Sequence, residues 1–254
     1  MSNLLDILKE DKDFENWAKG KTWDDIFFNC PKGEWLLWLF QKTNPEDIKL
    51  LTLAKGRCAN TMRYFMLHER TRQAIDIAIK FGTGKTSLNE LNSIVKISSD
   101  LAASYFSEFK KIEKGYNELD FNSELFLYSS IESVSIDSIN GQMGLNSIFY
   151  NLSEIGRIAV DIHAPAYHIA QYTSECIYEI ADYEPLELLR GYRPTHNVQE
   201  PSMAAGFPSM YSSYINNTLA TSINDTPEMA KEKNQLATAD ICRSLFPLPI
   251  WNIS

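Results

Sequence analysis

Apolar residues recur at three- and four-residue spacing over much of the chain, which predicts a helical protein. The clearest face consists of Ile48, Leu51, Ala54, Cys58, Met62 and Phe65. Further helices are predicted at 70–81, 88–102, 145–162, 166–181 and 226–245. The sequence therefore predicts an all-α or predominantly α fold, in which the N- and C-terminal helices pack together.

Several predicted helices carry the residue types that usually mark helix ends. Asn44 can cap a helix over the following residues, and Pro45 suits its first turn. Thr226 and Pro227 occupy the same two positions at the last helix, and Gly82 is placed to end the helix at 70–81.

The segment CPKGEWLLWLF, residues 30–40, contains an unbroken apolar run. Pro31 suits the first turn of a helix, and a helix that is apolar almost all round belongs in a core. We therefore expect Trp35 or Trp38 to be largely buried.

The middle of the chain, residues 115–225, differs from the two ends and holds most of the Gly, Pro, Asn and Tyr residues. The period at 121–136 is compatible with a helix or a strand, and Gly141 and Gly144 indicate a loop. Residues 190–209 form a predicted long loop, which in a compact domain is usually functional or mobile. We interpret the chain as a single domain, 1–254, in which 115–225 is an insertion or elaboration.

The chain is acidic, with 24 Lys and Arg residues, 33 Asp and Glu residues and a formal net charge of -9. Such a charge repels phosphate backbones, and no basic stripe offsets it, so nucleic-acid binding is disfavoured. A basic protein partner would be attracted. Alternatively, the charge only maintains solubility.

Export and membrane insertion are not expected from the sequence. The first residues, MSNLLDILKEDKD, do not resemble a signal peptide, and no apolar stretch is long enough to span a bilayer. Cys30, Cys58, Cys176 and Cys242 lack metal-ligand spacing, so we interpret them as small buried residues of a cytoplasmic protein.

The segment FGTGKTS, residues 81–87, only superficially resembles a phosphate-binding loop. That motif needs a glycine five residues before Gly84, where the chain has Ile79. We therefore predict a turn between two helices, followed by a capping box formed by Ser87 and Glu90.

Asp161, His163 and His168 are of the types that ligate metals, and they are the basis of an alternative function. A five-residue step turns about 140° around a helix, so the two histidines would not share a face. The other interpretation is a set of hydrogen-bonded polar residues at a helix start. His68 and His196 are expected at the surface.

An acidic cluster without intervening Lys or Arg follows in the sequence, and consists of Glu175, Glu179, Asp182, Glu184 and Glu187. The cluster is either a solvated helix face or a surface that meets a basic partner.

The CPKGEWLLWLF run, the segment KLLTLAKGRCANTMRYF at 49–65 and the end ATADICRSLFPLPIW at 237–251 together resemble a bacterial family of immunity proteins from polymorphic toxin systems. The resemblance covers roughly residues 1–105 and 230–254. The middle departs from it, because those proteins have long Ala-, Tyr- and Asp-rich helices there. The resemblance implies a shared helical scaffold and neutralisation of a toxin by tight binding, and it carries over no catalytic residue.

The predicted function is therefore stoichiometric binding and inhibition of another protein, either a toxin or a defence effector, in a bacterial cell or encoded by a phage. The alternative is a small-molecule enzyme, with or without a metal, that uses His163, His168 and nearby carboxylates. No cofactor is expected, and the sequence leaves homo-oligomer formation open.

The partner face is predicted where the acidic cluster meets the long loop, because loops carry recognition and Tyr and Arg are favoured interface anchors. Its predicted members are Glu175, Glu179, Glu184, Glu187, Arg190, Tyr192, Arg193 and Phe207. The alternative is that the aromatic residues hold the loop to its own core.

Overall fold

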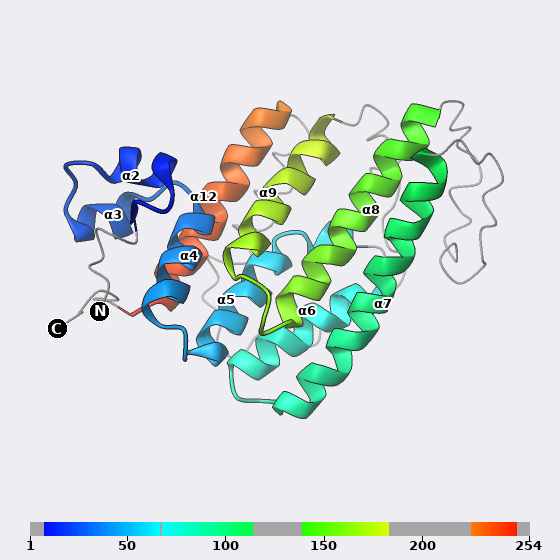
Figure 1. Ribbon diagram of the computed structural model, residues 1–254, viewed down its shortest axis with the longest axis horizontal. Coiled ribbons are helices and arrows are strands. Elements are labelled where there is room, and N and C mark those ends of the chain that lie inside the picture. The colour runs from blue at the N-terminus through cyan, green and yellow to red at the C-terminus, as the bar shows by residue number, and fades with distance from the viewer. Residues whose placement is uncertain (1–7, 67, 114–138, 183–224, 248–254) are drawn as a thin grey trace.

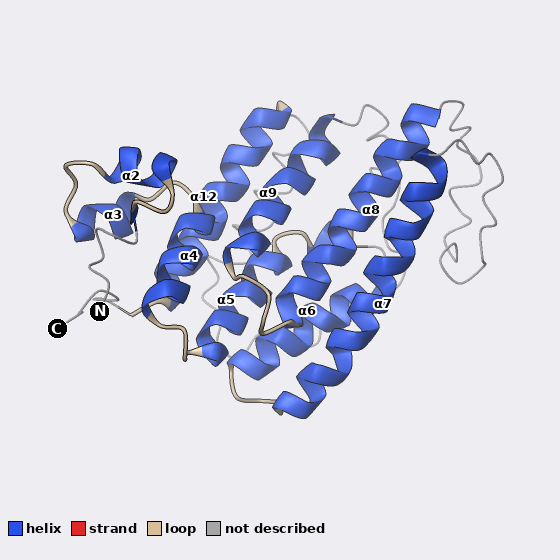
Figure 2. Cartoon of the chain, in the orientation of Figure 1, coloured by secondary structure: helices blue, strands red, loops and turns tan. Residues whose placement is uncertain are grey.

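The computed structural model describes residues 8–66, 68–113, 139–182 and 225–247. Within these ranges the chain forms helices and connecting turns, and it contains no strand (Figure 2). The predicted all-α fold is confirmed. The elements are α2 (Lys12–Ala18), α3 (Trp23–Asn29), α4 (Gly33–Thr43), α5 (Ile48–Asn60), the short 3-10 helix η1 (Arg63–Phe65), α6 (Glu69–Gly82), α7 (Leu88–Glu113), α8 (Ile139–Val160), α9 (Tyr167–Asp182) and α12 (Pro227–Leu245).

The longer helices lie side by side, in the order α4, α12, α9, α8 and α7 across the molecule (Figure 1). Helices α5 and α6 pack behind this row, and α2 and α3 lie at the end next to α4. One continuous apolar core joins residues from all of these helices. None of the helices in the described ranges has both the length and the apolar character needed to cross a bilayer.

The predicted start of the helix after Asn44 is wrong. Helix α5 begins at Ile48, and its N-cap is Asp47, whose side chain accepts from the backbone N–H of Leu50. Asn44 is instead the C-cap of α4, because its N–H bonds to the carbonyl of Phe40. Pro45 therefore follows a helix end, which is also a common position for proline.

The predicted loop at Gly141 and Gly144 is also wrong, because both glycines lie inside α8. A glycine inside a helix costs only about 1 kcal/mol relative to alanine. The buried face of α8, with Ile148, Leu152 and Ile155, gains more than this by packing.

Residues 83–87 form the predicted turn between two helices, α6 and α7. Gly84 has a φ of 73°, in the left-handed region that glycine adopts without strain. The N–H of Glu90 bonds to the Ser87 hydroxyl at 3.2 Å, which is half of the predicted capping box. The Glu90 carboxylate instead accepts from the hydroxyl of Thr86.

Trp35 is buried, as predicted, and only 7% of its surface is exposed. Its indole stacks on Phe14 of α2, with ring centroids 4.9 Å apart, and lies 5.7 Å from Trp17. Trp38 is only partly buried. The stacking of Trp35 on Phe14 therefore holds helix α2 against α4 and the rest of the core.

The two ends of the described chain meet where α4 crosses α12. At Gly33, an added Cβ would lie 2.6 Å from the backbone carbonyl carbon of Thr238, so the crossing requires glycine. Further along, Phe40 stacks on Phe246 at 4.0 Å, and Arg243 donates to the carbonyl of Cys30 at 2.8 Å. All four cysteines are free and buried, as predicted.

We predict that Trp35→Ala lowers the free energy of unfolding by about 3–5 kcal/mol, because it removes a buried indole and leaves a cavity. Trp38→Ala is the matched control, and it should cost clearly less because Trp38 is partly exposed. Chemical denaturation measures both, and equal losses would contradict the packing described here.

We also predict that Gly33→Ala destabilises the protein by about 1–3 kcal/mol, because the methyl group would overlap the α12 backbone. Gly156→Ala is the comparison, since its Cβ would meet chiefly the end of one side chain, Thr71 Cγ2, at 2.7 Å. Thermal unfolding of both variants measures the effect, and Gly156→Ala should cost less stability than Gly33→Ala. The reverse order would refute the close contact between α4 and α12 at Gly33.

Candidate functional site

Two adjoining clefts lie on the face formed by α2, α4, α9 and α12. The first has a volume of about 420 Å³ and lies between α2, α4 and α9. The second has a volume of about 540 Å³ and lies between α4, α9 and α12, with Asn151 of α8 also in its lining. Both are lined by Glu34 and Gln171, so we treat them as one surface, the groove. Clefts of this size can hold one or a few side chains of a partner.

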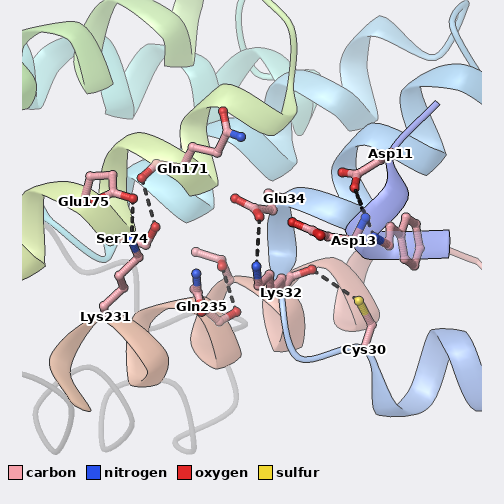
Figure 3. Close-up of polar contacts among 12 residues, drawn as sticks. Asp11, Asp13, Cys30, Lys32, Glu34, Gln171, Ser174, Glu175, Lys231 and Gln235 are labelled. Atoms are coloured by element: carbon pink, nitrogen blue, oxygen red, sulfur yellow. Dashed lines mark hydrogen bonds and ion pairs between the residues drawn. The ribbon is translucent and has the colours of Figure 1, made fainter. Parts of the chain in front are cut away.

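Glu34 is at the centre of the groove because of where α4 begins. Lys32 is the N-cap of that helix, and Glu34 lies in its first turn, beside the crossing with α12. Figure 3 shows the Glu34 carboxylate between Gln171 and Glu175 on one side and Asp13 on the other. The first turn of α4 thus directs a carboxylate into the space between three other helices.

The Glu34 carboxylate is mostly buried and weakly paired. Its partner among the described residues is Lys32, with Nζ 3.6 Å from Oε1. Burial raises the pKa of Glu34, nearby Lys32 opposes that rise, and Asp11 adds to it. Ionised Glu34 therefore carries a charge that the folded protein only partly compensates.

The α9 wall of the groove contains two carboxylates of the predicted acidic cluster. Glu175 pairs with Lys231 of α12 at 2.5 Å. Glu179 accepts from Asn151 at 2.8 Å and also from Ser147, and its pKa is raised, chiefly by burial. Glu175 is thus neutralised by a lysine from a distant segment, and Glu179 is held by neutral groups.

The α2 wall is also acidic, but most of its carboxylates are engaged. Asp11 caps α2 by accepting from the N–H groups of Asp13 and Phe14. Glu10 pairs with Lys42 at 2.7 Å. Asp13 is exposed at the edge of the first cleft.

The three residues of the alternative metal site, Asp161, His163 and His168, take part in other interactions in the structure. Asp161 accepts from Arg157 at 3.2 Å and from the N–H of His163 at 2.9 Å. The ring of His168 lies against Tyr167, and its pKa is lowered, first by burial and then by Arg157. In the part of the chain that the structure describes, no group of three His, Cys, Asp or Glu residues could hold a metal ion. His68 is partly buried and caps α6 by accepting from the N–H of Arg70.

Only part of the predicted partner face lies in the described residues. Glu175 and Glu179 are described, and both line the second cleft. Six predicted members lie outside the described residues: Glu184, Glu187, Arg190, Tyr192, Arg193 and Phe207. His196 and the undecided segment 121–136 lie outside them as well.

Five groove residues were not among the site residues predicted from the sequence: Lys32, Glu34, Gln171, Lys231 and Gln235. Glu34 lies between Gly33 and the first residue of the apolar run, Trp35, and this charged residue next to the run was the available signal. The other four become neighbours only through packing between α4, α9 and α12, which periodicity does not specify.

Comparisons with protein-family models, with curated proteins and with solved structures each gave no match for this chain. The resemblance to immunity proteins therefore stays a prediction that rests on the quoted sequence segments.

We predict that Glu34→Gln makes the protein more stable at pH 7. The pKa of Glu34 is raised above its ordinary value of 4.5. At pH values just above 4.5, the folded protein therefore binds more protons at Glu34 than the unfolded chain does. The free energy of unfolding of the wild type therefore falls as the pH rises and Glu34 ionises in the folded state. Glutamine does not ionise, so the variant does not lose this stability.

Chemical denaturation between about pH 4 and pH 8 measures the effect. The difference in the free energy of unfolding between variant and wild type should become smaller toward the acidic end. Glu232→Gln is the control, because Glu232 is an exposed α12 carboxylate outside the groove. A gap that is absent at pH 7, or that does not change with pH, would contradict the burial of Glu34.

Proposed function

We propose that this chain is a binding protein that neutralises another protein, a toxin or a defence effector, by stoichiometric binding. The groove is the proposed binding surface, and the proposed partner is basic. This extends the sequence-based partner face of Glu175 and Glu179 to α2, α4 and α12.

The observation that carries the proposal is the charge of the groove. Six carboxylates and three lysines line the two clefts. The surplus of carboxylates, in a chain of formal net charge -9, favours a partner of opposite charge and speeds its association.

The position of the groove gives further support. The segments that resemble immunity proteins include α4 and most of α12, and these two helices contact each other. The groove lies on this contact, since Glu34 belongs to α4 and Lys231 and Gln235 belong to α12. A binding surface shared by the two ends would explain why both ends carry the resemblance.

The test begins with capture of a partner from a lysate of the source organism on the tagged chain, followed by mass spectrometry. The purified partner should form a one-to-one complex, and it should lose its activity on binding. A Glu34→Lys, Glu175→Lys double variant should associate about tenfold more slowly and with less dependence on salt, because steering is lost.

A Glu46→Lys, Glu232→Lys double variant is the matched control, since it also reverses two charges, both at exposed positions outside the groove. It should associate nearly as fast as the wild type. A partner that keeps its activity in the complex would refute neutralisation, and equal association rates for all three proteins would move the binding surface away from the groove.

A further inference from the structure

The corner where α2 meets α4 holds the chain's own ammonium groups against indole rings. The distance from Nζ to the ring centroid is 4.3 Å for Lys21 over Trp17, 4.6 Å for Lys32 over Trp35 and 5.9 Å for Lys42 over Trp38. Because the face of an indole ring carries a partial negative charge, each contact is attractive. This corner of the molecule therefore already binds cations, and these cations are lysine side chains of the same chain.

The contact of Lys32 is the one inside the groove. Its ammonium group lies between the indole of Trp35 and the carboxylate of Glu34, at 4.6 Å and 3.6 Å. The second distance is too long for a hydrogen bond. The Lys32 side chain is 33% exposed, whereas that of Glu34 is 16% exposed, so a mostly buried carboxylate has a loosely held partner.

We propose that a cationic side chain of the partner protein, above all an arginine, binds between Glu34 and Trp35 and displaces Lys32. This inference rests on the proposed function, because it takes the groove to be the surface that a basic partner covers. It goes further by naming the side chain that enters the groove and the residue that it replaces.

Arginine fits this position better than the resident lysine does. Its planar guanidinium can donate two parallel hydrogen bonds to one carboxylate and can lie flat on an indole ring. Gln171, which lines both clefts, and Asp13, on the far side of Glu34, offer further acceptors (Figure 3). Among the described residues, the Lys32 ammonium contacts Glu34 and Trp35 and neither of these further acceptors.

The test uses a small probe, the capped tripeptide Gly-Arg-Gly, titrated into the full chain and followed by NMR or calorimetry. Matched probes carry lysine or citrulline in place of arginine, since citrulline keeps the shape of arginine and lacks its charge. We expect arginine to bind most tightly, lysine more weakly and citrulline not at all.

Variants then locate the bound cation. Glu34→Gln should weaken arginine binding about tenfold, because it removes a charge-assisted bidentate contact. Lys32→Ala should strengthen binding severalfold, and this gain should vanish in the Lys32→Ala, Glu34→Gln double variant. Lys49→Ala is the control, because Lys49 is an exposed lysine of α5 that lines neither cleft.

Wild-type affinity in the Glu34→Gln variant, or equal gains for the Lys32 and Lys49 variants, would overturn the proposal. Circular dichroism checks that each variant is folded, and Asp13→Asn, at the exposed edge of the cleft, is a second variant that should also weaken binding. Capture of a partner without any binding of the tripeptide would refute this inference alone. Binding of the tripeptide at Glu34 by a chain that captures no partner would support it and refute neutralisation.

Discussion

The close approach of α4 to α12 at Gly33 is the contact on which the candidate site depends. Because position 33 has no Cβ, the first turn of α4 lies directly on the backbone of Thr238. The same crossing brings Glu34 of α4 to the groove that Lys231 of α12 lines, although the two are far apart in the sequence. A larger residue at 33 would separate the helices and change the spacing of every charge between them.

A buried lysine fixes the opposite side of the groove. Lys55 of α5 is 2% exposed, and its ammonium donates to the backbone carbonyl of Asp161, at the end of α8, at 2.5 Å. Burial lowers the pKa of Lys55 to about 8, and the nearby Asp161 carboxylate limits that fall. Because an unpaired buried ammonium would be very costly, this bond holds the turn that leads into α9. The positions of Gln171 and Glu175 on α9 follow from that turn.

Much of the fold could be predicted from the sequence, and much less of the site could. The unbroken apolar run indicates that Trp35 is buried, and local capping signals identify the start of α12 at Thr226. The same local signals failed at Asn44, where one helix end and the next helix start lie within a few residues. Glu175 was recognised as part of an acidic cluster, but its ion pair with Lys231 joins residues 56 positions apart. Periodicity gives the face of a helix and does not give the helix that packs on it.

The ion pairs also change what the acidic composition means. A formal charge of -9 treats every carboxylate as free, yet in the groove Asp11 caps a helix, Glu10 pairs with Lys42, and Glu175 pairs with Lys231. Such engaged groups still contribute to the long-range field, since an ion pair leaves the surplus charge of the whole chain unchanged. They contribute little selectivity at contact, because a partner would first have to displace an internal cation or a backbone donor. Selectivity in the groove therefore depends on buried carboxylates that no internal cation holds tightly, and the loose Lys32 contact makes Glu34 one of them.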